Sequence, residues 1–278
     1  YPFLVLTDLL KKTDFFCFAA SKIDNISKNI FRISGYASSI ILIGILCGFP
    51  GAAKVTADLY CEKKITYEDA LRLSVFTNNP GPLFVIGTIG YGFLNSIEKG
   101  IELYLLLITS SFITGIIANR FIKQCDKKIT LNTAQNKSTE NITLSSISDS
   151  ITSAFFTMIP ITAAIVFFAF FSEAVISSNI IGAILNFLGL NKYNDISNAI
   201  VKCFFEITGG LSCLIPIIKD SKFLLPIICS ICGWAGISIH MQIIGFYGKA
   251  GIDIKYYIIG KIFNIFVVSV ISIIYVYI

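Results

Sequence analysis

The stretch CGFPGAAKV, residues 47–55, ends an apolar run that begins at Tyr36. As a helix, residues 36–46 would be about 16 Å long, roughly half of the ~30 Å hydrocarbon core of a bilayer. The Gly-Phe-Pro-Gly break at residues 48–51 frees backbone polar groups that hydrocarbon cannot satisfy, so it persists only beside protein or water. The stretch therefore predicts a helix that stops inside a membrane, next to a polar cavity.

The composition of the whole chain is that of a membrane protein. Its 278 residues are 55% apolar and 14% charged, and the mean hydropathy is +0.77. A soluble domain has about 25% charged residues. Residues 101–122 and 151–171 are uninterrupted apolar stretches, each long enough to cross a bilayer as a helix. The sequence thus predicts an all-α, multi-pass integral protein of the cell membrane.

The net charge of +5 indicates how the chain is oriented in the membrane, rather than a nucleic-acid partner. The polar connection at residues 123–148 carries Lys123, Lys127, Lys128 and Lys137 against Asp126 and Glu140. By the positive-inside rule, we expect this connection and the basic segment before residue 33 to face the cytoplasm. No nucleic acid is expected as a partner. Since the chain begins at Tyr1 rather than at a methionine, we also expect a segment to precede it.

A second break follows the first. The sequence NNPGP, residues 78–82, precedes another short apolar run that ends at Leu94. We predict a re-entrant hairpin over residues 33–62, a broken helix over 66–97 and a transmembrane helix over 101–122. Short, interrupted segments of this kind indicate the binding site of a secondary transporter.

An internal repeat is expected in such a transporter. FRISG (residues 31–35) recurs as FEITG (205–209), and GFPG recurs as GWAG (233–236). We therefore predict a first repeat over residues 1–122, a cytoplasmic loop over 123–148 and a second repeat over 149–278.

The predicted crossings decide how the two repeats are related. Three crossings, at residues 66–97, 101–122 and 151–171, separate the copies, and an odd number inverts the second copy. Residues 176–190 are too short for a further crossing, so we interpret them as interfacial. The fold class is thus an inverted repeat with re-entrant hairpins and discontinuous transmembrane helices.

The segments GFPGAAKVTADLY (residues 48–60) and FTNNPGPLFVIGTIGYG (76–92) resemble the YlbJ-type sporulation integral membrane proteins, also called SpoVV, of the nucleoside-recognition Gate superfamily. FFEITGGLS (204–212) and GWAGISIHMQ (233–242) extend the resemblance towards the C-terminus. It implies a carrier similar in plan to concentrative nucleoside transporters, assigned in this family to dipicolinic acid and to the outer forespore membrane. Lys54 stands where nucleoside carriers have an acidic substrate-binding motif.

The two breaks suggest how an anion would be bound. The half-helix after each break begins with free N–H groups that carry a partial positive charge, and Lys54 adds a full one. Dipicolinate, a flat dianion, suits such a site. The predicted substrate-binding residues are Gly48, Pro50, Gly51, Ala52, Lys54, Thr77, Asn78, Asn79, Gly81, Glu206, Thr208, Gly209, Gly233, Gly236, Ser238 and His240. Asn78 and Asn79 also suit helix caps.

Three of these residues have an alternative role in the structure of the protein. Lys54 can pair with Asp58, four residues later on a helix, or snorkel to the cytoplasmic surface. Glu206, beside an unwound segment at residues 208–210, can hold a coupling proton or sodium ion, or pair with Lys202. His240 suits either a proton relay or a hydrogen-bonded packing position.

Three functions are open at this stage. The first is a secondary carrier for a small anionic metabolite, most simply dipicolinic acid; the second is a nucleoside or nucleobase carrier; the third is a non-transporting scaffold for assembly of the spore envelope. An enzyme is not expected, because the sequence has no paired carboxylates, P-loop or nucleophile elbow. Cys229 and Cys232 have metal-ligand spacing but no second pair, so neither a metal nor another cofactor is expected beyond a coupling ion, H⁺ or Na⁺. The oligomeric state is left open.

Overall fold

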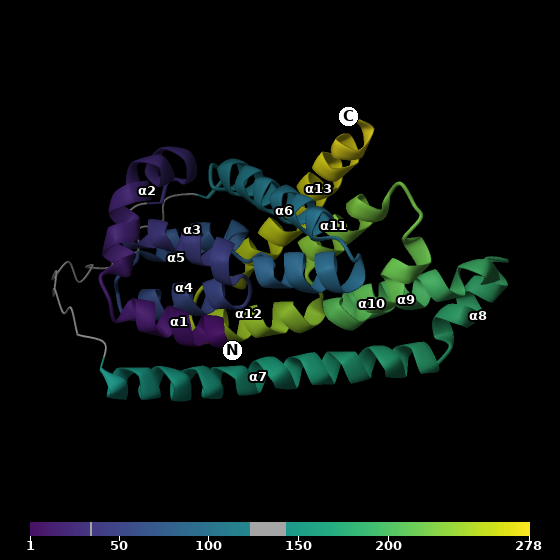
Figure 1. Cartoon of the computed structure of the whole chain (residues 1–278), viewed down its shortest axis with the longest axis horizontal. Helices are drawn as coiled ribbons and strands as arrows, with labels where there is room; N and C mark the ends of the chain where they lie inside the picture. The colour runs from purple at the N-terminus through teal and green to yellow at the C-terminus, as the bar shows by residue number, and fades with distance from the viewer. Residues whose placement is uncertain (34, 123–142) are drawn as a thin grey trace.

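The computed structural model describes residues 1–33, 35–122 and 143–278, and this part of the chain is helical without strands. Figure 1 shows the helices as one elongated bundle. The first part comprises α1 (Pro2–Lys11), α2 (Phe15–Phe31), α3 (Tyr36–Cys47), α4 (Gly51–Cys61), α5 (Tyr67–Phe76), the π-helix η1 (Leu83–Phe93) and α6 (Ile97–Ala118). The second comprises α7 (Leu144–Ser177), α8 (Ile180–Phe187), the 3₁₀ turn η2 (Asn191–Tyr193), α9 (Asn194–Phe205), α10 (Ile207–Ile218), α11 (Leu224–Trp234), α12 (Ile237–Ala250) and α13 (Ile254–Tyr277).

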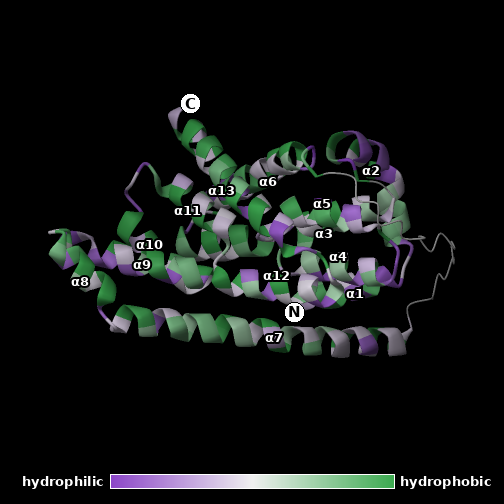
Figure 2. Ribbon diagram, turned by 180° about the vertical axis from the view of Figure 1, so that it is seen from behind, coloured by the Kyte–Doolittle hydropathy of each residue, from purple (hydrophilic) through white to green (hydrophobic). Residues whose placement is uncertain are grey.

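Four stretches are long and apolar enough to cross a membrane, namely α6, α7, the α11–α12 pair and α13. The bent pair α2–α3 makes a fifth if it is counted as one span. Figure 2 shows α7 as apolar over much of its length, and only 11% of its most apolar window is buried within the protein. Lipid is the environment that suits such a surface. The prediction of an all-α, multi-pass membrane protein is confirmed.

The two predicted transmembrane helices are present, and both begin earlier than predicted. Helix α6 begins at residue 97 because the Ser96 hydroxyl accepts the Lys99 N–H. Helix α7 begins at residue 144, where Thr143 and Ser146 form a capping box. The predicted loop over residues 123–148 therefore ends at residue 143, and residues 123–142 lie outside the described part.

The chain contains two series of helices in the same order. Each series consists of a helical hairpin (α3–α4, α9–α10), a broken helix (α5–η1, α11–α12) and a continuous helix (α6, α13). Helix α3 begins at residue 36 and α9 at 194, whereas α6 begins at 97 and α13 at 254, so equivalent elements are 158 and 157 residues apart. The break of the second hairpin is at Glu206 alone, not over the predicted segment 208–210, which is helical.

The short motifs used to locate the repeat are wrongly paired. FRISG precedes α3, whereas FEITG forms the break between α9 and α10; GFPG is the break of the first hairpin, whereas GWAG ends α11 at the second broken helix. Matches of four or five residues arise by chance in a chain so rich in isoleucine, phenylalanine and glycine. The order and length of the helices therefore locate the repeat more reliably than these short motifs do.

The two hairpins approach the centre of the bundle from opposite ends. Figure 1 places α3 and α4 towards one end of the long axis and α9 and α10 towards the other. Helices α5–η1, α6 and α7 lie between the hairpins in sequence, as in the predicted count of three crossings. This arrangement is the one expected of inverted copies, and the side of the membrane that each faces stays a prediction.

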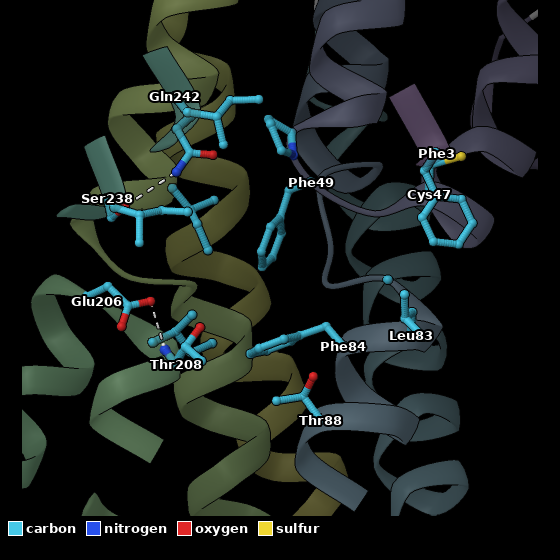
Figure 3. A pocket seen from close by; sticks show the side chains of 16 residues that line it. Phe3, Cys47, Phe49, Leu83, Phe84, Thr88, Glu206, Thr208, Ser238 and Gln242 are labelled. Carbon is cyan, nitrogen blue, oxygen red and sulfur yellow. Dashed lines mark hydrogen bonds between the residues drawn. The ribbon is translucent and has the colours of Figure 1, made fainter. Parts of the chain in front are cut away.

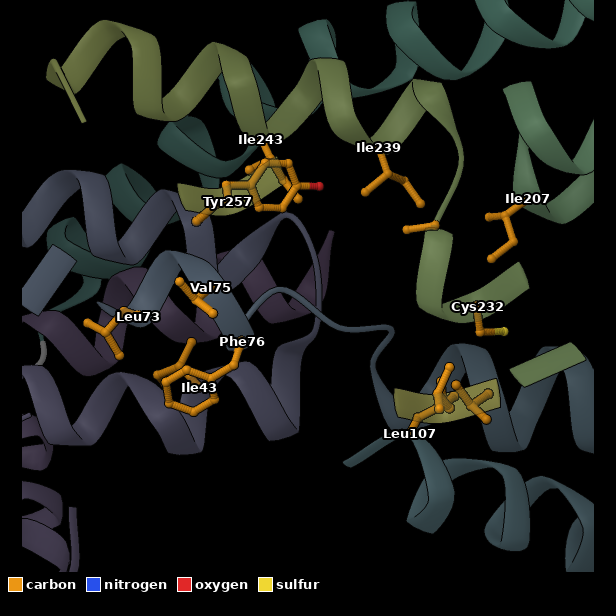
Figure 4. Close-up of a cluster of buried hydrophobic side chains, with 14 of the residues drawn as sticks. Ile43, Leu73, Val75, Phe76, Leu107, Ile207, Cys232, Ile239, Ile243 and Tyr257 are labelled. Carbon is orange, nitrogen blue, oxygen red and sulfur yellow. The ribbon is translucent and has the colours of Figure 1, made fainter. Parts of the chain in front are cut away.

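One hydrophobic core joins the two series. Figure 4 shows Leu107 of the first series near Cys232 of the second, and Val75 of the first near Tyr257 of the second; all four belong to a single buried cluster. Helix α13 packs directly on α5: a Cβ atom on Gly260 would lie 2.4 Å from the carbonyl oxygen of Val75. The breaks of both series are therefore held within one packed body.

Candidate functional site

The two breaks of the first series contact each other through their backbones. The Phe49 N–H donates a hydrogen bond to the carbonyl oxygen of Asn79 at 2.8 Å. Gly48 has a φ of +65°, and a Cβ atom there would lie 2.3 Å from the nitrogen of Gly81. The two breaks are thus in direct contact, and a backbone N–H of one is satisfied by a carbonyl oxygen of the other.

The two breaks of the second series also approach each other closely. Glu206 is extended between α9 and α10, with φ −141°, and Ala235 and Gly236 both have positive φ between α11 and α12. A Cβ atom on Gly236 would lie 3.2 Å from the carbonyl oxygen of Phe205. In each series, the break of the hairpin is thus in contact with the break of the broken helix.

A cavity of about 350 Å³ lies where the two pairs of breaks face each other (Figure 3). Its size and mostly apolar walls are those of small-molecule sites. The first series contributes Cys47, Phe49, Pro50, Gly81, Leu83, Phe84 and Thr88, the second contributes Glu206, Ile207, Thr208, Ser238, Ile239 and Gln242, and α1 and α7 contribute Phe3, Ile161 and Ile165.

Four half-helices begin at this cavity. Residues in their first turns or at their N-caps line it: Pro50 for α4, Leu83 for η1, Ile207 for α10 and Ser238 for α12. A helix N-terminus carries a partial positive charge of about half a unit. In the described residues no side chain caps α4, η1 or α12. The cavity is therefore surrounded by N–H ends that favour negative charge.

The N-terminus of α10 differs, because the carboxylate of Glu206 caps it. Oε1 accepts the Thr208 N–H at 2.9 Å, and Oε2 accepts the Gly209 N–H at 2.6 Å. The side chain is buried, with 8% exposed. Lys202, the partner considered from the sequence, pairs instead with Glu173 at 2.5 Å. Among the described residues that line the cavity, Glu206 has the one charged side chain. Its carboxylate is hydrogen-bonded within its own hairpin, to the start of α10.

Comparison with known proteins agrees with this architecture. The chain is 26% identical over 289 residues to the sporulation integral membrane protein YlbJ of Bacillus subtilis (strain 168). The alignment covers 94% of this chain and 69% of YlbJ. The chain is therefore similar to this integral membrane protein over most of its length. The resemblance found at residues 48–92 is thus confirmed, together with a multi-pass membrane location. No family model and no solved structure matches the chain, so membership of the Gate superfamily stays a prediction.

Lys54 lies outside the cavity lining. Its Nζ is 3.0 Å from Oδ2 of Asp58, and Nζ of Lys11 on α1 is 2.7 Å from the same oxygen. Lys54 is on the fourth position of α4, where its side chain is turned towards α1. The local ion pair with Asp58 is thus the arrangement found, and a role of Lys54 in substrate binding stays a prediction.

Thr77, Asn78 and Asn79, predicted as site residues, form hydrogen bonds at the break between α5 and η1, behind the cavity. Asn78 Nδ2 donates to the carbonyl oxygen of Ser74 at 3.3 Å and to the hydroxyl of Tyr247 at 2.7 Å. Asn79 Nδ2 donates to the carbonyl oxygen of Phe76 at 2.6 Å and to Oγ of Ser111 at 2.7 Å. The Thr77 hydroxyl donates to a backbone carbonyl of α5. All three are buried and none lines the cavity, so the capping alternative accounts for the contacts they make.

His240 also faces away from the cavity. Its Nδ1 shares a hydrogen bond of 2.7 Å with the hydroxyl of Tyr257, and its ring lies 4.4 Å from that of Trp234. Ser238 and Gln242 line the cavity from the opposite side of α12, where Gln242 donates to Ser238. The contacts of His240 are those of a packing position.

Five of the predicted residues line the cavity: Pro50, Gly81, Glu206, Thr208 and Ser238. The others lie behind it or beside it: Gly48, Gly51, Ala52, Lys54, Thr77, Asn78, Asn79, Gly209, Gly233, Gly236 and His240. Sequence reasoning missed Phe49 and Phe84, which point into the space in Figure 3, and Gln242. Gln242 lies four residues after Ser238, so helical spacing could have found it. No local signal marks Phe3 or Ile161.

Proposed function

We propose that this YlbJ relative is a secondary transporter whose substrate, a small flat anionic metabolite, binds in the cavity between the four breaks. Dipicolinic acid is the leading candidate. The observation that carries the proposal is the start of four half-helices at one cavity, three of them without a side-chain cap in the described residues.

Electrostatics favours a dianion over a monoanion here. The N-termini of α4 and η1 belong to one wall of the cavity and that of α12 belongs to the opposite wall. A ligand with carboxylates at both ends can accept N–H groups from both walls at once. Because the cavity is lined mainly by apolar side chains, these dipoles act in a lower dielectric than water and are correspondingly stronger.

The apolar part of the lining suits a flat ring. Phe49 and Phe84 extend from the two breaks of the first series towards the second series (Figure 3). Aromatic side chains of this kind stack on planar ligands and leave the ring edges free for polar contacts. The polar edge groups available are Thr88, Thr208 and the Ser238–Gln242 pair.

A nucleoside or nucleobase is the second candidate, and one observation favours it. Glu206 brings a negative charge to the lining, where no cationic side chain is found. A carboxylate suits hydroxyl or amide donors better than it suits a second carboxylate. For the dianion, this repulsion is offset because both oxygens of Glu206 already accept backbone N–H groups.

The test is binding and flux with purified full-length protein. Dipicolinate and uridine are titrated separately, and uptake of each is followed in proteoliposomes with an imposed proton or sodium gradient. We expect dipicolinate to bind, raise the melting temperature by mass action and enter the vesicles, and uridine to do none of these. The reverse order of ligands would support the nucleoside candidate. A folded protein that binds and transports neither would support a scaffold.

A further inference from the structure

Lys261, two turns into α13, is a buried lysine whose ammonium has no hydrogen-bond or ion-pair partner in the described part of the chain. Its side chain is 3% exposed, and Nζ makes neither a hydrogen bond nor an ion pair with any residue that the structure describes. A buried, unpaired charge costs several kcal/mol, and ionisable residues inside membrane proteins usually serve binding or transport. The position therefore calls for a functional explanation.

Lys261 lies against the wall of the cavity. Its Nζ is 5.8 Å from the centroid of the Phe49 ring, and Phe49 is a lining residue at the tip of the first hairpin. An ammonium over an aromatic face is attracted by the ring quadrupole. The Phe49 ring thus borders both the positive charge of Lys261 and the space in which a ligand would bind.

The polar neighbours of Lys261 on α13 are occupied elsewhere. Tyr257 and Asn264, four residues before and three after, share its helix face. The Tyr257 hydroxyl is bonded to His240, and Asn264 Oδ1 accepts the hydroxyl of Thr114 at 3.2 Å. Neither neighbour brings a negative charge to Lys261.

The one carboxylate in the lining is also occupied. Both oxygens of Glu206 accept N–H groups at the start of α10, and no ion pair joins Glu206 to a lysine in the described residues. The charge of Lys261 is therefore not neutralised by the protein around the cavity, and it adds to the field of the uncapped N-termini of α4 and η1.

We propose that Lys261 determines the specificity of the cavity for anions: its ammonium, behind the Phe49 ring, attracts the carboxylates of an aromatic acid stacked on that ring. This inference rests on the proposed function and names the side chain that supplies the missing positive charge. One unit charge acting over less than 10 Å, at an effective dielectric constant of about 20, changes affinity by about tenfold. A carboxylate-free ligand of the same shape gains nothing from it.

The test compares dipicolinate with pyridine-2,6-dicarboxamide, which has the same flat shape and no charge. Binding of both is measured for wild-type protein, Lys261→Met, Lys261→Arg and Lys255→Met. Lys255 is an exposed lysine on the same helix, so its substitution controls for the loss of one positive charge from α13. The readout is the ratio of the two affinities, which a general loss of stability does not change.

We expect wild-type protein, Lys255→Met and Lys261→Arg to prefer dipicolinate, and Lys261→Met to lose about tenfold of that preference. A folded Lys261→Met protein with the wild-type ratio would overturn the inference and leave the proposed function intact. Wild-type protein that binds both ligands equally would overturn it as well. Wild-type protein that binds neither would refute the proposed function itself. If Lys261→Met does not fold, Lys261→Gln, which keeps a polar side chain without the charge, takes its place.

Discussion

The two helical hairpins solve the same problem in different ways. In α3–α4 the break is three residues long, and its backbone is tied to the second break by the bond from Phe49 to Asn79. In α9–α10 the break is one residue, and the side chain of Glu206 caps the following helix. The first solution leaves the N-terminus of α4 uncapped, whereas the second closes that of α10 with the chain's own acid. The difference teaches that the cavity is electrostatically asymmetric, and that its positive wall is the first series.

The largest expected effect concerns the contact within the first series. Gly48→Ala would place a methyl group 2.3 Å from the backbone nitrogen of Gly81, at a φ of +65°. We expect a loss of more than about 3 kcal/mol of stability or failure to fold, measured as the monodisperse yield and the melting temperature in detergent. Gly245→Ala on α12, which meets no atom within 4 Å, is the matched control. A Gly48→Ala protein as stable as this control would show that the breaks are not locked together.

The second effect concerns the cap of the other hairpin. Glu206→Gln keeps the size of the side chain but leaves one N–H of the α10 terminus without its acceptor. We expect a loss of about 1–2 kcal/mol of stability and, because a negative charge leaves the cavity, a higher affinity for dipicolinate. Calorimetric titration measures the affinity of the variant for dipicolinate and for uridine. Weaker binding of dipicolinate would contradict the asymmetry, and a selective loss of uridine binding would favour the nucleoside candidate.

A smaller effect is expected for the ion pairs of Asp58 on α4. Asp58→Asn removes the carboxylate that Lys11 and Lys54 share, whereas Lys54→Gln removes one pair. We expect a loss of about 1 kcal/mol for the first and less for the second, because these side chains are partly exposed. Thermal melting checks the order. Since neither residue lines the cavity, dipicolinate affinity should be unchanged, and a change confined to Lys54→Gln would return that lysine to the site.

The smallest effect is expected on the second-series wall. Ser238→Ala removes a lining hydroxyl that accepts from Gln242. The net contribution of a hydrogen bond is at least about 0.5 kcal/mol, so dipicolinate affinity should fall by about twofold. Ser212→Ala, at an exposed hydroxyl on α10, should have no effect on affinity in the same titration. Equal affinities for the two variants would remove Ser238 from the binding surface.

The breaks were predictable because glycine and proline act locally. Helices are interrupted by Gly48, Pro50 and the segment 78–82 whatever the tertiary structure around them. Because hydrocarbon cannot satisfy the freed backbone groups, such breaks must lie against protein or water. The cap at Glu206 was less visible, since an acid before a helix either caps it or pairs with a neighbour such as Lys202. Propensity does not decide between these roles.

The walls of the cavity depend on contacts between distant residues. Phe3 and Ile161 reach it from α1 and α7, which no repeat or motif connects with the breaks. The direction of the Lys54 side chain could not be predicted, because position in the first turn of a helix does not fix it; in the structure it points to Asp58, which Lys11 of α1 also contacts. Lys261 did carry a signal, a lysine inside the apolar run 254–277, but its contact with Phe49 is visible only in the folded chain.

Protection of Cys47 from thiol modification tests the central claim, an anion site between the breaks, most directly. Cys47 lines the cavity, whereas Cys213 on α10 is exposed outside it. Single-cysteine variants that keep one or the other are treated with a maleimide, with and without dipicolinate or uridine. Dipicolinate should slow modification of Cys47 and leave that of Cys213 unchanged, and uridine should protect neither. Binding of dipicolinate without protection of Cys47, or protection by uridine instead, would contradict the account.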